Sequence, residues 1–427
     1  MNRKPSVFVV FLTVFIDFIG FGIVMTMLPM YSRKFGASGL EIGLIFASYS
    51  AMQFIFSPIW GRLSDRIGRR PVLLMSTAGA CVSYVIFALA FALSSHVATL
   101  WWIAISRILA GACAGNVTVA QAYIADITPA EKRSKMMGII GMAIGLGFVF
   151  GPALGGVGSL GIGSEGPGWI AAALSASNFI LAYAILSESR RPSSEPVRAR
   201  PHLDQWMHTL STPKVGLLVV VFALATFFFS CFESTLPLLV QDNFQLHNFD
   251  HAITVGFFLF VYCGLIGAFV QGGATGRLVK RFGEPRLIMM SLVLTGLSLV
   301  LMPFVKGAPK FSLGVLFHAA GWPWVKLLFV LALLSVGTSL ARPPIFGLLS
   351  NLTPEHEQGA TIGVAQGAGS LARIIGPIFA TALYVYIPAL PYVICGALAL
   401  GTGAVALQRL GHEEKAAPAV EPVKLAQ

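Results

Sequence analysis

The stretch VFVVFLTVFIDFIGFGIVMTMLPM, residues 7–30, contains a single charged side chain, Asp17, and is otherwise almost entirely apolar. A helix needs about 20 apolar residues to cross the hydrocarbon core of a bilayer, so this stretch predicts a membrane span. It follows Arg3 and Lys4, as a secretory signal would. However, it is longer than the apolar part of a signal peptide and no small-residue cleavage site follows it. We therefore interpret it as a retained first transmembrane helix.

Similar apolar stretches recur along the whole chain. Of the 427 residues, 56% are hydrophobic and 11% are charged. A soluble domain has about 25% charged residues, so lipid rather than water is expected to surround most of this chain. The sequence thus predicts an all-α integral membrane protein with twelve transmembrane helices. The predicted spans are 7–30, 41–60, 72–94, 98–124, 136–157, 168–186, 215–240, 252–275, 286–305, 325–350, 359–386 and 389–408.

The basic balance of the chain is explained by membrane topology. The net charge is +11. With a cytoplasmic N-terminus, 21 of the 29 Lys and Arg residues fall on the cytoplasmic side, 5 on the outer side and 3 within spans, when Arg286 and Lys326 at span ends are counted with the adjoining loops. Short basic loops remain in the cytoplasm. We therefore expect a multi-pass protein of the inner (plasma) membrane, with both termini cytoplasmic and no nucleic-acid partner.

The two halves of the chain repeat one plan. A polar interruption rich in Arg and Pro separates six spans from six, and its composition suits a linker that buries no core. Three short motifs recur in the same order in both halves. They pair 127–152 with 352–377, Gly61 and Gly68 with Gly276 and Gly283, and Leu28-Pro29 with Leu236-Pro237. Internal repeats are common in secondary transporters, whose binding site lies near the midplane.

The expected organisation is therefore two pseudo-symmetric six-helix bundles. The first bundle is expected at 1–188 and the second at 215–410. A cytoplasmic linker at 189–214 joins them, and a cytoplasmic tail follows at 411–427.

The segment after the second span reads GRLSDRIGRRP, residues 61–71. Glycine permits a tight return between helices, and a carboxylate among four arginines is expected to be ionised and paired. The segment resembles the signature of the major facilitator superfamily, G-x-x-x-D-R-x-G-R-R, and matches every fixed position. Its matching residues are Gly61, Asp65, Arg66, Gly68, Arg69 and Arg70.

The resemblance implies a gate on the cytoplasmic side. Asp65 would face the start of the eleventh helix, near 358–361, where the helix dipole stabilises an anion. An arginine of the same segment would pair with Asp126, at the end of the fourth helix, and Arg133 would join the cluster. Together these contacts would hold the two halves shut.

The fifth span carries a second motif, GMAIGLGFVFGPALGG, residues 141–156. Small residues permit close helix packing, which by itself explains such a pattern. The pattern also resembles the antiporter signature of drug exporters in this superfamily, and this resemblance implies export. The matching residues are Gly147, Gly151, Pro152, Gly155 and Gly156.

Two carboxylates, Asp17 and Glu233, lie well inside apolar stretches and are candidates for proton coupling. A carboxyl group whose burial changes between two conformations can bind and release a proton. The surroundings of Asp17 resemble the first helix of drug exporters in the superfamily, and Arg107 resembles the fourth-helix arginine linked to coupling there. Alternatively, Asp17 neutralises a packing contact, Arg107 forms a structural salt bridge, and Glu233 faces a cationic substrate.

Six further polar residues are candidates for the substrate cavity. Two of them share one face of the fourth span with Arg107 at helical spacing. Two are arginines that could neutralise an anionic substrate, one beside a double proline that is expected to break the tenth span. The remaining two could instead form interhelical hydrogen bonds. The candidates are, in that order, Thr118 and Gln121, Arg342 and Arg373, and Gln53 and Asn178.

The favoured function is proton-coupled export of a drug-like or amphipathic small molecule by alternating access. The sequence contains no pattern for a nucleotide, metal or nucleophile site, and its five cysteines all fall in spans. We therefore expect no enzyme activity, no cofactor and a proton gradient as the driving force, with a monomer sufficient. The alternatives are a proton-coupled importer, an exporter of a metabolite or organic anion on the same fold, and a transport-dead membrane sensor.

Overall fold

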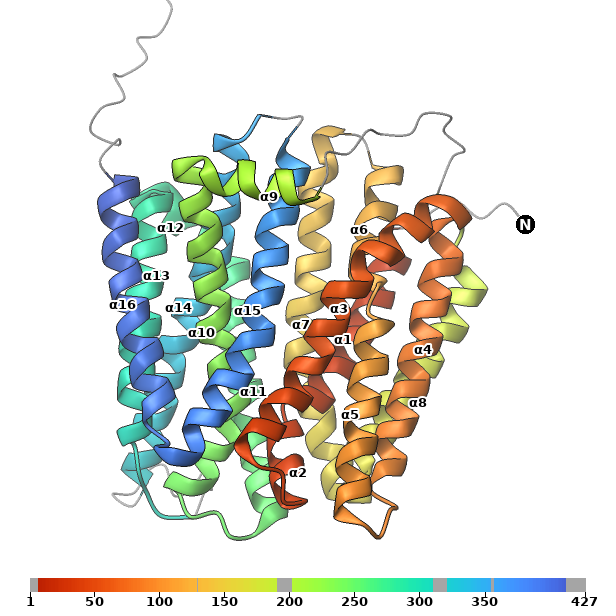
Figure 1. Ribbon diagram of the computed structural model, residues 1–427, viewed down its shortest axis with the longest axis vertical. Helices are drawn as coiled ribbons and strands as arrows, with labels where there is room; N and C mark the ends of the chain where they lie inside the picture. Colours follow the sequence, from red (N-terminus) through yellow and green to blue (C-terminus); the bar gives the residue numbers. More distant parts are fainter. Residues whose placement is uncertain (1–6, 129, 190–201, 310–320, 355–356, 412–427) are drawn as a thin grey trace, which may run out of the picture.

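The computed structural model describes residues 7–128, 130–189, 202–309, 321–354 and 357–411. These residues form helices and short connections, without strands. Twelve helical segments are long and apolar enough to cross a membrane. Figure 1 shows them standing side by side in two groups. The predicted all-helical fold with twelve spans is thus confirmed.

The first bundle contains eight helices, because its first and fourth spans are each divided in two. They are α1 (Val7–Met25), α2 (Leu28–Lys34), α3 (Gly39–Ile67), α4 (Arg69–Ala90), α5 (His96–Ala112), α6 (Asn116–Ile127), α7 (Ala130–Ile162) and α8 (Gly166–Ile185). The helix α9 (His202–Ser211) follows in the predicted linker, of which 190–201 lies outside the described residues.

The second bundle follows α9 directly. Its helices are α10 (Pro213–Asn243), α11 (Phe249–Phe269), the π-helical turn η1 (Val270–Ala274), α12 (Thr275–Phe282), α13 (Glu284–Leu301), the 3-10 turn η2 (Met302–Phe304), α14 (Trp322–Leu352), α15 (Gln358–Tyr386) and α16 (Leu390–Gly411). The predicted tail beyond 411 lies outside the described residues.

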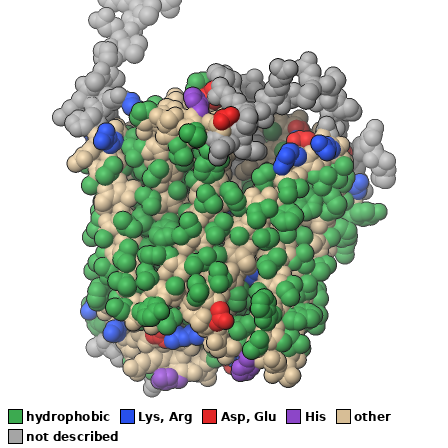
Figure 2. All heavy atoms as spheres, viewed as in Figure 1, with side chains coloured by type: hydrophobic (Ala, Val, Ile, Leu, Met, Phe, Trp, Pro, Cys, Tyr) green, Lys and Arg blue, Asp and Glu red, His purple; other side chains and the backbone are tan. Residues whose placement is uncertain are grey.

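The two ends of the molecule differ. We call the end near Gly68 and α9 the linker end, and the end near Ser38 and Asn248 the far end; the linker end is at the top of Figure 1. Figure 2 shows hydrophobic side chains over the middle of one face, with most of its charged side chains near the two ends. This distribution is the one that a bilayer requires, because burying an unpaired charge in hydrocarbon is costly.

The backbone confirms two of the three repeated motifs. Gly68 has φ +105° and ψ 160°, and Gly283 has φ +75° and ψ 159°. This region of backbone space is open almost only to glycine. Thr128 and Thr353, each followed by proline, are both extended after their helices. The third pair differs, since Pro29 begins α2 whereas Pro237 lies inside the unbroken α10.

The molecule is closed at the far end. There α3 packs so tightly on α15 that a Cβ atom added to Gly43 would lie 2.7 Å from the Cα atom of Ile378. Arg33 of α2 forms an ion pair with Asp242 of α10 (2.7 Å), and Asp242 accepts a hydrogen bond from the hydroxyl of Tyr384 (2.8 Å). Figure 1 shows α3 and α15 together at the far end and diverging towards the linker end.

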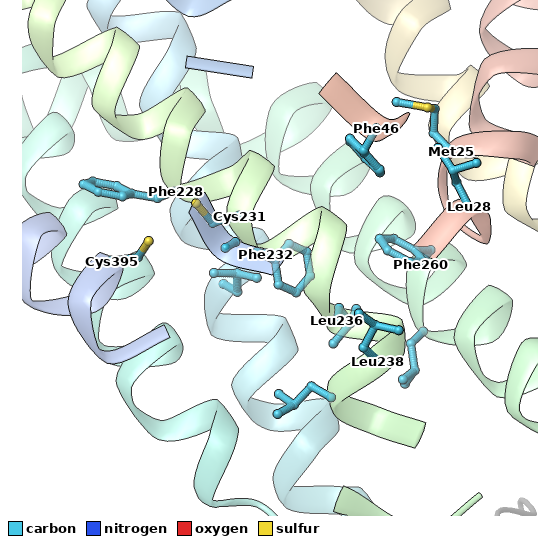
Figure 3. Close-up of a cluster of buried hydrophobic side chains, with 14 of the residues drawn as sticks. Met25, Leu28, Phe46, Phe228, Cys231, Phe232, Leu236, Leu238, Phe260 and Cys395 are labelled. Carbon is cyan, nitrogen blue, oxygen red and sulfur yellow. The ribbon is translucent and has the colours of Figure 1, made fainter. Parts of the chain in front are cut away.

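An apolar core seals the space between the bundles above this far-end contact. It is one cluster of buried side chains drawn from both bundles. Figure 3 shows part of it, with Met25, Leu28 and Phe46 of the first bundle beside Phe260 of the second. Opening the far end would expose some of these side chains to water, at a cost of about 1.5–3 kcal/mol for each one fully exposed. The structure therefore represents a conformation closed at the far end, in which α3 and α15 diverge towards the linker end.

Candidate functional site

Asp17 lies in the middle of α1, and α8 holds its carboxylate. The side-chain amide of Asn178 donates to Asp17 Oδ1 at 2.9 Å and to the main-chain oxygen of Thr13 at 3.0 Å. Asp17 Oδ2 has no hydrogen-bond partner among the described residues. Because a buried polar atom without a partner is costly, this oxygen is where a proton or a polar ligand gains most by binding.

The Asp17 side chain lines a small cavity of about 40 Å³ inside the first bundle. Tyr49 and Gln53 of α3, Tyr84 of α4 and Asn116 of α6 also line it. The Oδ1 atom of Asn116 likewise lacks a partner among the described residues. A water molecule needs about 10–15 Å³, whereas a drug-sized ligand needs about 300 Å³ or more. The cavity therefore suits water and protons rather than a drug-sized molecule.

Arg107 of α5 is completely buried next to this cavity. Its guanidinium carbon lies 5.7 Å from the ring centroid of Tyr84 and 5.4 Å from that of Phe87. Nε donates to Ser106 Oγ at 3.4 Å, while Nη1 and Nη2 have no hydrogen-bond partner among the described residues. The alternative of a structural salt bridge is therefore not supported in this conformation. Tyr84 therefore lies beside Arg107 and also lines the Asp17 cavity.

The prediction that Arg107, Thr118 and Gln121 share one face of a single helix is wrong in one respect. The helix is interrupted at Cys113–Gly115, so Thr118 and Gln121 belong to α6 rather than to the helix of Arg107. The Oγ1 atom of Thr118 lies 2.6 Å from Ser57 Oγ, which makes it a contact between α6 and α3. Gln121 is exposed. Helical spacing cannot reveal such an interruption, because the residues at the break are small and apolar.

The two remaining cavity candidates of the first bundle, Gln53 and Asn178, lie in different surroundings. Gln53 lines the Asp17 cavity. Asn178 is fully buried and donates to Asp17, and its place in the substrate cavity stays a prediction. The alternative interpretation of Asn178, an interhelical hydrogen bond, is confirmed by its bond to Asp17.

The second bundle brings three charged residues together. Glu233 of α10 is buried, and Arg373 of α15 is near enough for the two charges to act on each other. Arg373 also acts on Arg342 of α14, whose guanidinium lies over the rings of Phe222 and Phe346. Neither arginine forms an ion pair with a carboxylate among the described residues. The predicted break at Pro343-Pro344 is absent, since α14 continues to Leu352.

The segment 61–71 is more helical than predicted. It forms the end of α3, a single connecting glycine at Gly68, and the first turn of α4. Gly61 is thus a helical residue, and only Gly68 needs the freedom of glycine. The expected ion pair with Asp126 is present and is made by Arg69 (Nε to Oδ2, 3.0 Å). Arg69 also donates to Ser64 Oγ at 2.7 Å.

The expected contact between Asp65 and the eleventh helix is not found among the described residues. The Asp65 side chain is 60% exposed and pairs with Arg69 at 2.7 Å. The latch therefore stays a prediction, for a conformation in which the two bundles meet at the linker end. The side chain of Arg133 lies outside the described residues.

The glycine motif of α7 forms the contact between three helices. Gly147 and Gly151 pack on the backbone of α1, where a Cβ atom on Gly151 would lie 2.8 Å from the Cα atom of Gly22. Gly155 and Gly156 face Phe257 of α11, in the second bundle. Pro152 lies inside the continuous α7. The helix-packing interpretation is therefore correct, and this packing spans the boundary between the bundles.

Sequence reasoning missed two groups of residues. Glu188 accepts hydrogen bonds from the backbone N–H groups of Arg69 and Arg70 at the start of α4, which is the favourable place for an anion. The far-end pair of Arg33 and Asp242 joins the bundles across 209 positions of sequence. An isolated acid next to the polar linker was a signal for Glu188, whereas no local signal pointed to the far-end pair.

Comparisons with known proteins agree with this architecture. A profile of the Major Facilitator Superfamily matches residues 10–311 and 274–426. The tetracycline resistance protein, class C, of Escherichia coli is 31% identical over 90% of this chain and 91% of its own length. The quinolone resistance protein NorA of Staphylococcus aureus is 27% identical over 96% and 97%. The crystal structure of the human organic anion transporter MFSD10 (TETRAN) has 26% identity and a TM-score of 0.63, covering 95% of this chain and 100% of that one.

Two six-helix bundles around buried charged residues define a multi-pass membrane transporter of small molecules. This chain belongs to the major facilitator superfamily.

Proposed function

We propose that this protein exports a drug-like, amphipathic molecule in exchange for protons, by alternating access. One observation carries the proposal: Asp17, deep in the membrane-spanning bundle, keeps one carboxylate oxygen unpaired in a cavity with room for water. The relatives named for tetracycline and quinolone resistance support a drug as the cargo. The glycine motif that joins α1, α7 and α11 provides a close contact at the boundary about which the bundles would rock, because small residues let helices approach closely.

In this cycle the described conformation is the loading state. Positive-inside topology places the linker end in the cytoplasm, so the cargo enters there while the far end is closed. Closing the linker end would bring Asp65 to the start of α15 and break the far-end ion pair of Arg33 and Asp242. Protonation of Asp17 or Glu233 from outside would favour release, and loss of the proton inside would reset the protein.

The proposal includes a proton gradient as the only driving force, with no cofactor and no enzyme activity. It places the protein in the inner (plasma) membrane with both termini in the cytoplasm. A monomer suffices, since one chain contains both bundles and the path between them.

A second candidate, export of an organic anion on the same fold, is favoured by Arg342 and Arg373 and by the similarity to MFSD10. Import of a proton-coupled solute would use the same parts in the opposite direction. Counterflow measured from each side of the membrane separates these directions.

The test uses purified protein in proteoliposomes with an acidic interior and tetracycline or norfloxacin outside. Wild-type protein is expected to accumulate at least one of them and to lose this activity when the gradient is collapsed. Asp17→Asn keeps an oxygen that accepts from Asn178 but cannot exchange a proton, so it should lose gradient-driven transport. Asp204→Asn, an exposed position on α9, serves as the matched control. Full activity of Asp17→Asn and of Glu233→Gln would refute the coupling assignment.

A further inference from the structure

We infer that Arg342 and Arg373 form a binding subsite for an acidic group on the transported molecule. This inference rests on the proposed transport function and names the chemistry of its cargo. The cargo is an amphipathic molecule that carries a carboxylate or a similar anion next to an aromatic or apolar body.

The first support is the position of Arg342. Its guanidinium lies over the rings of Phe222, from α10, and Phe346, from α14, at 5.9 and 5.6 Å from the ring centroids. Those rings contact each other edge to face at 4.9 Å. Arg342 is exposed, but its guanidinium lies over Phe222, which is 4% exposed, so its charged end lies on the side of α14 that packs against α10.

The second support is the position of Arg373 relative to the same rings. A Cβ atom added to Gly369 of α15 would lie 2.8 Å from Phe222 Cε1, so this face of α15 packs on Phe222. Arg373 follows four residues later and therefore lies on the same face. It is half-buried, and its charge acts on that of Arg342. Arg342 and Arg373 thus share one region beside Phe222, where α10, α14 and α15 meet.

The third support is the charge balance of that region. Glu233 is the one carboxylate whose charge acts on Arg373, and it forms no ion pair with either arginine among the described residues. With Glu233 ionised, two cations still face one anion. One further negative charge would neutralise the region, and a charged side chain at membrane depth normally faces a partner or a cavity.

The chemistry of arginine selects the kind of anion. Its planar guanidinium donates two parallel hydrogen bonds to a carboxylate and also lies flat on aromatic rings. Phe222 and Phe346 already provide such an aromatic surface beside Arg342. Asp17, in the first bundle, leaves its own oxygen free for a proton or a cationic group. Asp17 lies in a separate small cavity inside the first bundle, so the acidic group of the cargo is assigned to the two arginines alone.

The experiment compares norfloxacin, which has a carboxylate and an amine, with its methyl ester, which keeps the amine and loses the acid. Equilibrium binding to detergent-purified protein and gradient-driven transport are both measured. Wild type should prefer the acid. Arg342→Gln and Arg373→Gln should each weaken acid binding by about 10- to 150-fold, the range for a lost hydrogen bond to a charged group. Binding of the ester should not change, which also shows that the variants are folded.

Two controls complete the test: a variant at an exposed arginine, and the addition of an anionic lipid. Arg409→Gln, an exposed arginine of α16, should leave both affinities unchanged. Added anionic phosphatidylglycerol should not displace norfloxacin, because the subsite faces the interior. Equal binding of acid and ester by wild type, unchanged preference in both arginine variants, displacement by the lipid, or binding of neither probe would overturn the inference. Acid preference without gradient-driven transport would support the subsite and refute the proposed export.

Discussion

Gly43 offers a direct way to shift the balance between the two conformations. In the described conformation a Cβ atom at this position would lie 2.7 Å from the Cα atom of Ile378 and 3.0 Å from the oxygen of Pro377. Both are backbone atoms of α15, which cannot rotate away as a side chain can. Gly43→Ala should therefore force α3 and α15 apart at the far end.

The size of the effect follows from known costs of overpacking. An extra methyl group in a well-packed contact costs about 1–3 kcal/mol. Alanine also gains up to about 1 kcal/mol of helix propensity over glycine. That gain applies equally to both conformations, since α3 is expected to remain helical in each, and so cancels from their ratio. The ratio of far-end-open to far-end-closed molecules should rise about 5- to 140-fold.

Spin-label distance measurements can detect this shift. Labels on Ser94→Cys and His247→Cys, both exposed at the far end of opposite bundles, report the separation there once the five native cysteines are replaced. Gly43→Ala should increase the population of long distances. Gly363→Ala is the matched control, because a methyl group there meets no atom within 4 Å. Identical distance distributions for the two variants would refute the reasoning.

Three further predictions concern the linker end and the support of Asp17. Gly68→Ala should lower the thermal unfolding midpoint measurably, since φ +105° costs a residue with a Cβ atom about 1–3 kcal/mol; an unchanged midpoint would contradict this. Arg69→Ala should destabilise the protein in the same assay by removing the ion pair with Asp126, and Arg69→Lys should restore only part of the loss. Asn178→Ala removes the donor to Asp17, at a cost of about 1–3 kcal/mol. It should alter the pH profile of transport, and an unaltered profile would leave Asn178 with a purely structural role.

Much of the fold followed from local sequence. Apolar runs of spanning length predict helices, because backbone groups in lipid must bond within their own segment. The repeat of Gly68 at Gly283 could also be predicted from the sequence, because both positions need a backbone conformation that only glycine adopts easily. Helix interruptions were not readable in the same way. The double proline does not break α14, whereas small apolar residues at 113–115 end α5.

The candidate site was predicted by residue type but not by contact. Asp17 and Arg107 were found because charges in apolar stretches are rare. Their different surroundings, one held by Asn178 with a free oxygen and the other stacked on rings without a carboxylate, depend on how the helices are rotated. When apolar residues cover every side of a helix, its sequence does not show which side faces the neighbouring helices.

The sequence by itself determined that lipid surrounds most of the chain and that twelve segments span the membrane. It also determined that the two halves repeat one plan, and which residues can carry charge within the membrane. Those properties depend on composition and short spacing, which each segment carries independently. Only the tertiary structure decided which end is closed, that Arg33 meets Asp242, and that Arg342 and Arg373 share one region. These are contacts between helices far apart in sequence, and they depend on the packing of side chains from both bundles at once.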